Sequence, residues 1–206
     1  MYIPKINLIT DKDEMLAFMR QFSFATIVTA KANLPVATHL PFVVSVQDGQ
    51  VILAAHFAKA NDHWADIENN QALVIFTEPH AYISPKNYEK ELNVPTWNYI
   101  SVHAYGTGEL ITDTKGALQV LEAAIDNYEI GYRQQWEKFP AEYKMKMLNG
   151  IVAFKIVVTD LQAKKKLSQN RTTAEKEQII DTLSKTDDSN GQLIADYMRK
   201  ESMIHR

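Results

Sequence analysis

The segment Val44-Ser45-Val46-Gln47-Asp48-Gly49-Gln50-Val51-Ile52-Leu53 predicts how this chain folds. Apolar residues flank an Asp-Gly pair, and this pair favours the two-residue turn in which both central positions have positive φ. The alternation of apolar and polar residues before the turn is typical of a half-buried strand. The segment therefore predicts an antiparallel hairpin, with one strand over residues 35–46 and its return over residues 50–56.

Similar patterns continue on both sides of this hairpin. Runs of β-branched and apolar residues predict four more strands, over residues 24–29, 72–77, 97–111 and 151–159. Helical periodicity predicts helices from Asp11, over 113–128 and 141–148, and two amphipathic helices over 175–184 and 192–202. Six antiparallel strands with one buried face are best satisfied by closing into a barrel, which removes the edges. We therefore expect an α+β protein, mostly β: a six-stranded antiparallel barrel with peripheral helices and a C-terminal helical tail.

The composition is that of a globular protein. Of 206 residues, 46% are hydrophobic and 23% are charged, which excludes a mostly disordered chain. This length suits one barrel domain, expected over residues 1–160, with residues 161–206 as a basic segment and helical tail packed on the barrel or on a dimer partner. The net charge of −3 argues against a protein that coats nucleic acid. Cysteine is absent, which excludes disulfides, thiolate metal sites and a cysteine nucleophile.

No targeting or membrane segment is evident in the sequence. The N-terminal residues contain no apolar run of signal-peptide length. The longest apolar runs, in residues 151–158, are too short to span a bilayer. We therefore expect a soluble cytoplasmic protein without membrane contact.

Known catalytic and metal-binding motifs are also missing. Five of the six histidines fall between residues 39 and 103, but none has the His-Glu-x-x-His spacing of a zinc site. We interpret them as histidines whose ring nitrogens are satisfied by backbone groups, and we expect no metal. The serine-hydrolase elbow, the P-loop and the dinucleotide-binding glycine pattern are all absent. No catalytic residue can be assigned, and the sequence leaves open whether the protein is an enzyme.

A planar ligand that carries a phosphate fits the sequence better. In the segment from His56 to Asn61 a strand ends, a turn of small residues follows, and a short helix begins at Asn61. Free N–H groups there attract an anion, and Lys59 adds a positive charge beside them. An exposed lysine beside an ordinary helix cap explains this stretch equally well. The aromatic, amide and hydroxyl groups of residues 79–85 and 94–99 can either cover a ring or pin a loop.

The only basic cluster is Lys164-Lys165-Lys166 with Arg171. It offers phosphate contacts to DNA or to a ligand. For Lys164 and Lys165 we favour a solvated strand end. The two C-terminal helices are joined by the acidic Asp187-Asp188, and the last helix has few side chains suited to base edges. The sequence therefore argues against direct DNA binding.

These segments together resemble the PaiB-like family of FMN-binding negative transcriptional regulators, which have the FMN-binding split-barrel fold. The matching blocks are residues 1–4, 38–42, 56–61 with Trp64, 79–85, 94–99 with 102–103, and 166–171. They follow in order over nearly the whole chain. The sequence departs from the family pattern at Asp62, where the family often has proline, at Lys86-Asn87, where it tends to have tryptophan, and at Lys165, where an aromatic residue is common.

The resemblance implies a homodimer with FMN at the subunit interface. Carried onto this chain, it places Thr38, His39 and Leu40 near the flavin ring, and Lys59 and Asn61 near the phosphate. The segments around Tyr82, around Trp97 and Asn98, and from Lys166 to Gln169 close the pocket. The full set of expected FMN-binding residues is Thr38, His39, Leu40, Pro41, His56, Ala58, Lys59, Asn61, Tyr82, Trp97, Asn98, Lys166, Ser168 and Gln169.

Three functions remain open at this point. The resemblance implies a flavin-binding repressor of stress, sporulation or protease genes, acting directly or through a small-molecule or redox signal. The alternative is a flavin-dependent oxidoreductase on a small substrate, since one fold supports many activities. A third possibility is a dimeric scaffold whose pocket is a relic.

Overall fold

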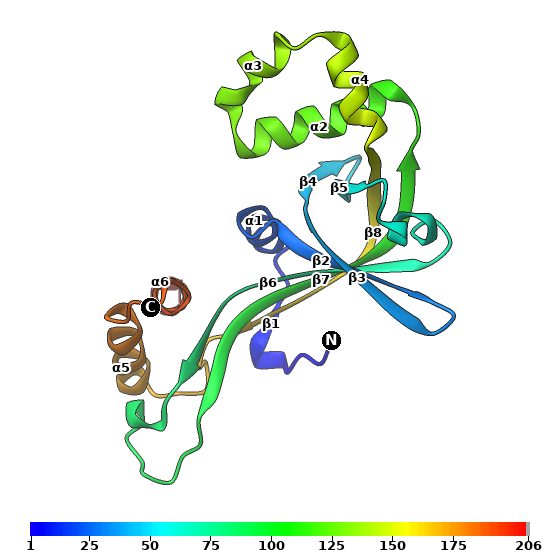
Figure 1. The fold of residues 1–206 in the computed structure, drawn as a ribbon. Coiled ribbons are helices and arrows are strands. Elements are labelled where there is room, and N and C mark those ends of the chain that lie inside the picture. The colour runs from blue at the N-terminus through cyan, green and yellow to red at the C-terminus, as the bar shows by residue number, and fades with distance from the viewer. Residues whose placement is uncertain (205–206) are drawn as a thin grey trace. The chain divides into compact units, whose positions relative to one another are not determined.

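The computed structural model describes residues 1–204. Within these residues, eight strands combine with six α-helices and four short 3₁₀ turns (Figure 1). The strands are β1 (Leu8–Ile9), β2 (Phe24–Lys31), β3 (Leu34–Pro41), β4 (Val43–Gln47), β5 (Gln50–Ala58), β6 (Gln71–Ile83), β7 (Thr96–Ile111) and β8 (Ile151–Lys166). The α-helices are α1 (Lys12–Gln21), α2 (Thr114–Tyr128), α3 (Arg133–Glu137), α4 (Ala141–Asn149), α5 (Thr173–Ser184) and α6 (Ser189–Ile204). The short 3₁₀ turns are η1 (Lys5–Asn7), η2 (Asp62–Asp66), η3 (Pro85–Asn87) and η4 (Ile130–Tyr132).

The strands form one sheet in the order β3-β2-β6-β7-β8-β5-β4, and β1 pairs with β8. Each pair whose register is resolved is antiparallel, which confirms the predicted α+β class. The sequence predicted six strands, whereas the described residues form eight. The single strand expected over residues 35–46 is divided at Phe42, whose ring is fully buried and whose N–H donates to the Ser23 carbonyl. The eighth strand, β1, is too short to give a sequence signal.

The hairpin predicted from the Asp-Gly pair is confirmed. Asp48 and Gly49 have φ values of 49° and 80°, and β4 pairs with β5 from Gln47–Gln50 outward. The β2–β3 hairpin turns in the same way, with Ala32 and Asn33 at φ 48° and 65°. Both pairs supply the positive φ that the right-handed twist of the flanking strands requires.

By their internal contacts, the residues group into two compact units, each discontinuous in sequence. We call Met1–Met15, Thr77–Val102 and the residues from Gln162 onward the first unit. The second unit comprises Leu16–Phe76 and His103–Leu161. The strands β6, β7 and β8 continue from one unit into the other (Figure 1). The expected domain boundary at residue 160 remains a prediction.

The second unit is built around a cluster of phenylalanine rings. Phe42, Phe57, Phe76 and Phe154 are fully buried, and the rings of Phe57 and Phe154 stack at 4.6 Å between centroids. Burying each ring contributes roughly 1.5–3 kcal/mol. Helix α2 is joined to this core because the Tyr128 hydroxyl donates to Ser23 Oγ at 2.8 Å. The cluster thus sets the positions of β3 and of the turn after β5.

The first unit contains the ends of the three long strands together with β1, α5 and α6. Thr172 and Glu175 form a reciprocal capping box that begins α5. Ile179 and Ile194 bury the facing sides of α5 and α6. The final strand extends to Lys166, seven residues beyond the expected end at Thr159, and the tail helices follow it. Within residues 1–204, no helix has the length and apolar character needed to cross a membrane.

Candidate functional site

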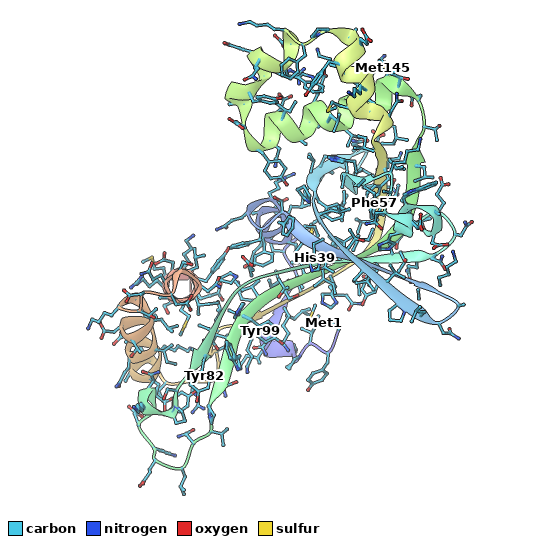
Figure 2. The ribbon with its side chains drawn as sticks, in the orientation of Figure 1. Met1, His39, Phe57, Tyr82, Tyr99 and Met145 are labelled. Carbon is cyan, nitrogen blue, oxygen red and sulfur yellow. The ribbon has the colours of Figure 1, made fainter. Side chains whose placement is uncertain are left out.

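Four of the predicted residues lie on β3, the edge strand of the sheet. Thr38 and Leu40 are half-buried, whereas His39 and Pro41 are exposed, as strand alternation requires. Phe24 on the neighbouring β2 is 69% exposed, and its ring stacks on His39 with centroids 6.4 Å apart. Figure 2 shows His39 on this hairpin. An exposed aromatic surface beside an unpaired strand edge offers a planar ligand both stacking contacts and backbone hydrogen bonds.

The turn after β5 carries the predicted phosphate donors. Ala58 and Lys59 are exposed, and the Lys59 ammonium has no partner among residues 1–204. The N–H groups of Lys59 and Asn61 donate to backbone carbonyls, at 2.9 Å each. Those of Ala60 and Asp62 have no acceptor within the same part of the chain. One ammonium and two free N–H groups therefore lie within four consecutive residues.

These donors fit a flavin phosphate. A phosphate is bound by charge-assisted hydrogen bonds from ammonium and backbone N–H groups, and the turn supplies both kinds. The Asp62 carboxylate lies next to these donors and repels an anion. The turn is therefore less positive than it would be with the uncharged proline that the family often has at this position. When bound, FMN supplies a redox-active ring, and β3 is the segment that would hold it.

A buried histidine, His63, joins this turn to β3. Its Nε2 lies 2.9 Å from Thr29 Oγ1 and its Nδ1 lies 2.9 Å from Thr38 Oγ1. The Asn61 amide also donates to Thr38 Oγ1, at 3.2 Å, and its oxygen caps η2 by accepting the His63 N–H. The Thr38 hydroxyl accepts from the Asn61 amide and shares a second hydrogen bond with Nδ1 of His63. The ring and phosphate segments of the expected site thus share one hydrogen-bonded network.

Burial keeps His63 neutral. It lowers the pKa of His63 below the ordinary value of 6.5, and the nearby Asp66 carboxylate opposes part of this shift. Sequence reasoning did not select His63 or Thr29 for the site. The sequence feature that could have identified His63 is the short Asn61-x-His63 spacing, in which a capping residue and a histidine lie on one turn. The expectation of backbone partners is wrong for His63, because the hydroxyls of Thr29 and Thr38 bond both of its ring nitrogens.

The other histidines differ in their environment. His56 is half-buried on β5, and burial lowers its pKa. The Nδ1 atom of His103 is buried without a hydrogen-bond partner among residues 1–204, and burial lowers the pKa of this ring as well. In that part of the chain, no three histidine or carboxylate side chains are placed to hold a metal ion. His103 keeps one hydrogen-bonding position open.

The remaining predicted residues belong to the first unit, and several are bonded to one another. Asn98 is fully buried and exchanges two hydrogen bonds with Ser168, at 3.0 and 3.1 Å. Gln169 folds back on its own chain and accepts the Leu167 N–H at 2.8 Å. Lys166 donates to the Thr96 hydroxyl. These polar groups hold the end of β8 to β7, and in this arrangement Ser168 and Asn98 present no free edge to a ligand.

Tyr82 and Trp97 are exposed and lie against each other. Their ring centroids are 5.8 Å apart in an edge-to-face arrangement, and His80 lies at the same distance from Trp97. Both rings are about half exposed. This aromatic surface agrees with a covering role toward a planar ring, which stays a prediction.

The expectation of a solvated basic strand end was wrong for Lys164 and Lys165. Lys164 is 8% exposed, and its ammonium lies over the Tyr99 ring at 5.0 Å. Lys165 forms ion pairs of 2.5 Å with both Glu14 and Glu201. The strand continues through both residues, so their side chains pack against neighbouring elements. Neither ammonium is available as a free contact for DNA phosphates.

Comparison with known proteins agrees with this picture. Residues 1–160 match a family described as "Putative FMN-binding domain". Over 202 residues the chain is 38% identical to the "Protease synthase and sporulation protein PAI 2" of Bacillus subtilis, and the match covers 96% of each chain.

Solved structures show a similar fold at low sequence identity. The FAD and heme binding protein of Mycobacterium smegmatis superimposes with a TM-score of 0.62 at 17% identity, covering 78% of this chain and 73% of that one. The flavocytochrome Anf3 of Azotobacter vinelandii gives a TM-score of 0.63 at 15% identity, covering 80% and 72%. The likeness confirms the split-barrel fold.

Proposed function

The chain belongs to the PaiB-like family, whose domain is described as FMN-binding, and on this premise we propose that it is a cytoplasmic, homodimeric FMN-binding regulator that lowers gene expression. The ring of the flavin lies along Thr38–Pro41, and its phosphate lies at Lys59–Asp62. The name of the Bacillus subtilis relative, which refers to protease synthesis and sporulation, suggests the class of regulated genes.

One observation carries the flavin site. The Asn61 amide and the His63 ring both bond to Thr38, which brings the free donors of the turn beside β3. A ligand with a planar ring at one end and a phosphate at the other matches this arrangement, because the edge of β3 can contact a ring and the turn supplies donors for an anion. The network makes the site rigid before a ligand binds, which lowers the entropy cost of binding.

The proposed regulation works through the flavin rather than through reading of DNA. The net charge is −3, and all three clustered lysines have partners within the chain. Nonspecific DNA affinity depends on free cations that replace the counterions of phosphates. We therefore infer that the occupancy or redox state of the flavin is the signal and that another molecule passes it to the transcription machinery.

The dimer is proposed from the exposed edge of β3. Phe24 and Leu34, on the β2–β3 hairpin, are each 69% exposed, and the edge of β3 offers unpaired backbone groups. A two-fold contact covers the same surface on both chains and closes the edge. Light scattering at micromolar concentration should give a particle of twice 23.5 kDa, and a particle of monomer mass would contradict the proposal.

The decisive experiment is the absorbance spectrum of the purified protein with and without added FMN. Bound flavin should appear after gel filtration, with bands shifted from those of the free compound. Addition of NADPH then separates the two functions. Bleaching without steady consumption of NADPH supports a sensor, whereas sustained turnover with an electron acceptor supports the oxidoreductase. A protein that retains no flavin at any concentration would overturn the site.

A further inference from the structure

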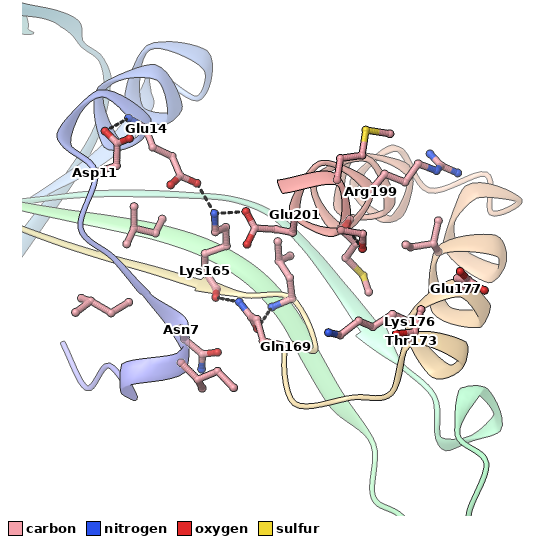
Figure 3. A pocket seen from close by; sticks show the side chains of 18 of the residues that line it. Asn7, Asp11, Glu14, Lys165, Gln169, Thr173, Lys176, Glu177, Arg199 and Glu201 are labelled. Atoms are coloured by element: carbon pink, nitrogen blue, oxygen red, sulfur yellow. Dashed lines mark hydrogen bonds and ion pairs between the residues drawn. The ribbon is translucent and has the colours of Figure 1, made fainter. Parts of the chain in front are cut away.

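The first unit contains a cavity whose lining includes a single residue of the expected flavin-binding set, Gln169. It has a volume of about 840 Å³ and is walled by η1 and β1, by the end of β8, and by α5 and α6 (Figure 3). The cavity shares no residue with the Thr38–Asp62 site. A volume of this size accommodates a small organic molecule.

Negative charge is in excess on the wall of this cavity. The lining contains five carboxylates and three cationic side chains. Lys165 lies between Glu14 and Glu201, and its ammonium binds only Oε1 of each carboxylate. One positive charge thus serves two negative ones, as Figure 3 shows. The second oxygens of Glu14 and Glu201 have no partner among residues 1–204 and can accept from a donor.

Asn7 provides an independent sign that a ligand belongs in the cavity. It is 8% exposed and lines the cavity, yet its side-chain amide has no hydrogen bond within residues 1–204. Its backbone N–H, in contrast, donates to the Pro4 carbonyl at 2.9 Å. Most of the Asn7 side chain is shielded, yet its amide atoms remain accessible and can bond a ligand in the cavity.

The rest of the lining favours an apolar body on the ligand. Ile6, Leu8 and Met203 line the cavity and remain 57%, 46% and 73% exposed. Large apolar side chains gathered at the mouth of a charged cavity gain free energy when an apolar group covers them. Leu167 and Met198, which are buried, form part of the wall behind them.

From this combination we propose that the cavity binds a small organic cation, an ammonium group on an apolar body. The ammonium donates to the free oxygens of Glu14 and Glu201, and the negative charge of the lining favours a cation throughout the cavity. The apolar body covers Ile6, Leu8 and Met203. Because α6 contributes Glu201, binding also fixes α6 against β8 and α1. The site stands independently of the flavin.

The test is calorimetric titration of the full chain, without FMN, using n-hexylammonium as the probe. Hexylammonium should bind at least tenfold tighter than n-hexanoate, which has the same apolar chain and the opposite charge. It should also bind at least tenfold tighter than ethylammonium. Equal affinity for hexylammonium and hexanoate would overturn the charge argument, and equal affinity for the two amines would overturn the apolar one.

Three variants locate the probe. Glu201→Gln removes one carboxylate and should weaken hexylammonium binding about fivefold or more. Asn7→Asp adds a carboxylate at the open amide and should tighten binding, a gain that misfolding cannot produce. Glu109→Gln is the matched control, because Glu109 pairs with Lys155 at 2.8 Å and lies outside the cavity. If Glu201→Gln and Asn7→Asp bind the probe as the parent does, the ligand does not occupy this cavity.

Discussion

Asn61 and Thr38, 23 residues apart, are joined by a 3.2 Å hydrogen bond from the Asn61 amide to Thr38 Oγ1. The same hydroxyl lies 2.9 Å from Nδ1 of the buried His63. Thr38 therefore connects the edge strand to the turn that carries the free N–H groups. The pair holds together the two ends of the proposed flavin site, and each change below tests one part of this arrangement.

Lys59→Ala should weaken FMN binding about 10- to 100-fold. The change removes a charge-assisted hydrogen bond to the phosphate, worth about 1.5–3 kcal/mol. Riboflavin, which lacks the phosphate, serves as the control ligand and should bind both proteins equally in a fluorescence-quenching titration. Equal losses for the two ligands would show that Lys59 acts on folding or on the ring.

Asp62→Asn should have the opposite effect on FMN. It removes a negative charge close to the proposed phosphate position, which at the surface is worth about 0.5–1 kcal/mol. FMN affinity should rise two- to fivefold at low salt, and the gain should shrink as salt screens the charges. A gain of the same size for riboflavin would argue against a phosphate at this turn.

Thr38→Val should lower the free energy of unfolding by about 1–3 kcal/mol. The valine leaves Nδ1 of His63 and the Asn61 amide without their common partner in a buried site. Thr38→Ser keeps the hydroxyl and should recover most of the stability. Denaturant unfolding measures both variants, and indistinguishable curves for valine and serine would show that the network contributes nothing.

Acid should destabilise the protein through His63. Burial lowers its folded-state pKa, so below the unfolded value of 6.5 the unfolded chain takes up a proton that the folded chain refuses. The contribution to stability is therefore complete above pH 6.5 and is lost as the pH falls below that value. His56 and His103 act in the same direction.

The comparison that isolates His63 uses a glutamine variant. Between pH 6.5 and 5, the unfolding free energy of His63→Gln should fall less steeply than that of the parent. The two slopes should differ by at most about 1.4 kcal/mol per pH unit. His80→Gln, at an exposed position, is the control and should follow the parent. Parallel curves for His63→Gln and the parent would remove His63 as a source of the acid sensitivity.

Ser168→Ala should destabilise the protein without ligand. Ser168 is buried, and its hydroxyl forms two hydrogen bonds with the fully buried side chain of Asn98. Removing the hydroxyl should lower the free energy of unfolding by about 1–3 kcal/mol. Ser202→Ala, an exposed position bonded within its own helix, should change stability by only a few tenths of a kcal/mol. A Ser168→Ala protein that melts like the parent, yet responds weakly to FMN, would return Ser168 to the flavin site.

Local sequence was sufficient for most of the fold. The Asp48-Gly49 pair predicted its turn because its backbone requirement is met by those two residues alone. The capping of α1 by Asp11 and of η2 by Asn61 depends on bonds to residues two or three positions away. The family blocks, spread along the chain, identified the flavin-binding class.

The tertiary structure decided which of these residues meet. The sequence alone could not place His63 between Thr29 and Thr38, pair Asn98 with Ser168 across 70 positions, or bury Lys164. Periodicity and turn chemistry report the conformation of neighbouring residues, whereas burial and partner choice depend on how the sheet brings distant strands together. Lys165 was expected at a solvated strand end, and it is an ion-paired residue of a cavity wall only because α1 and α6 place Glu14 and Glu201 beside it.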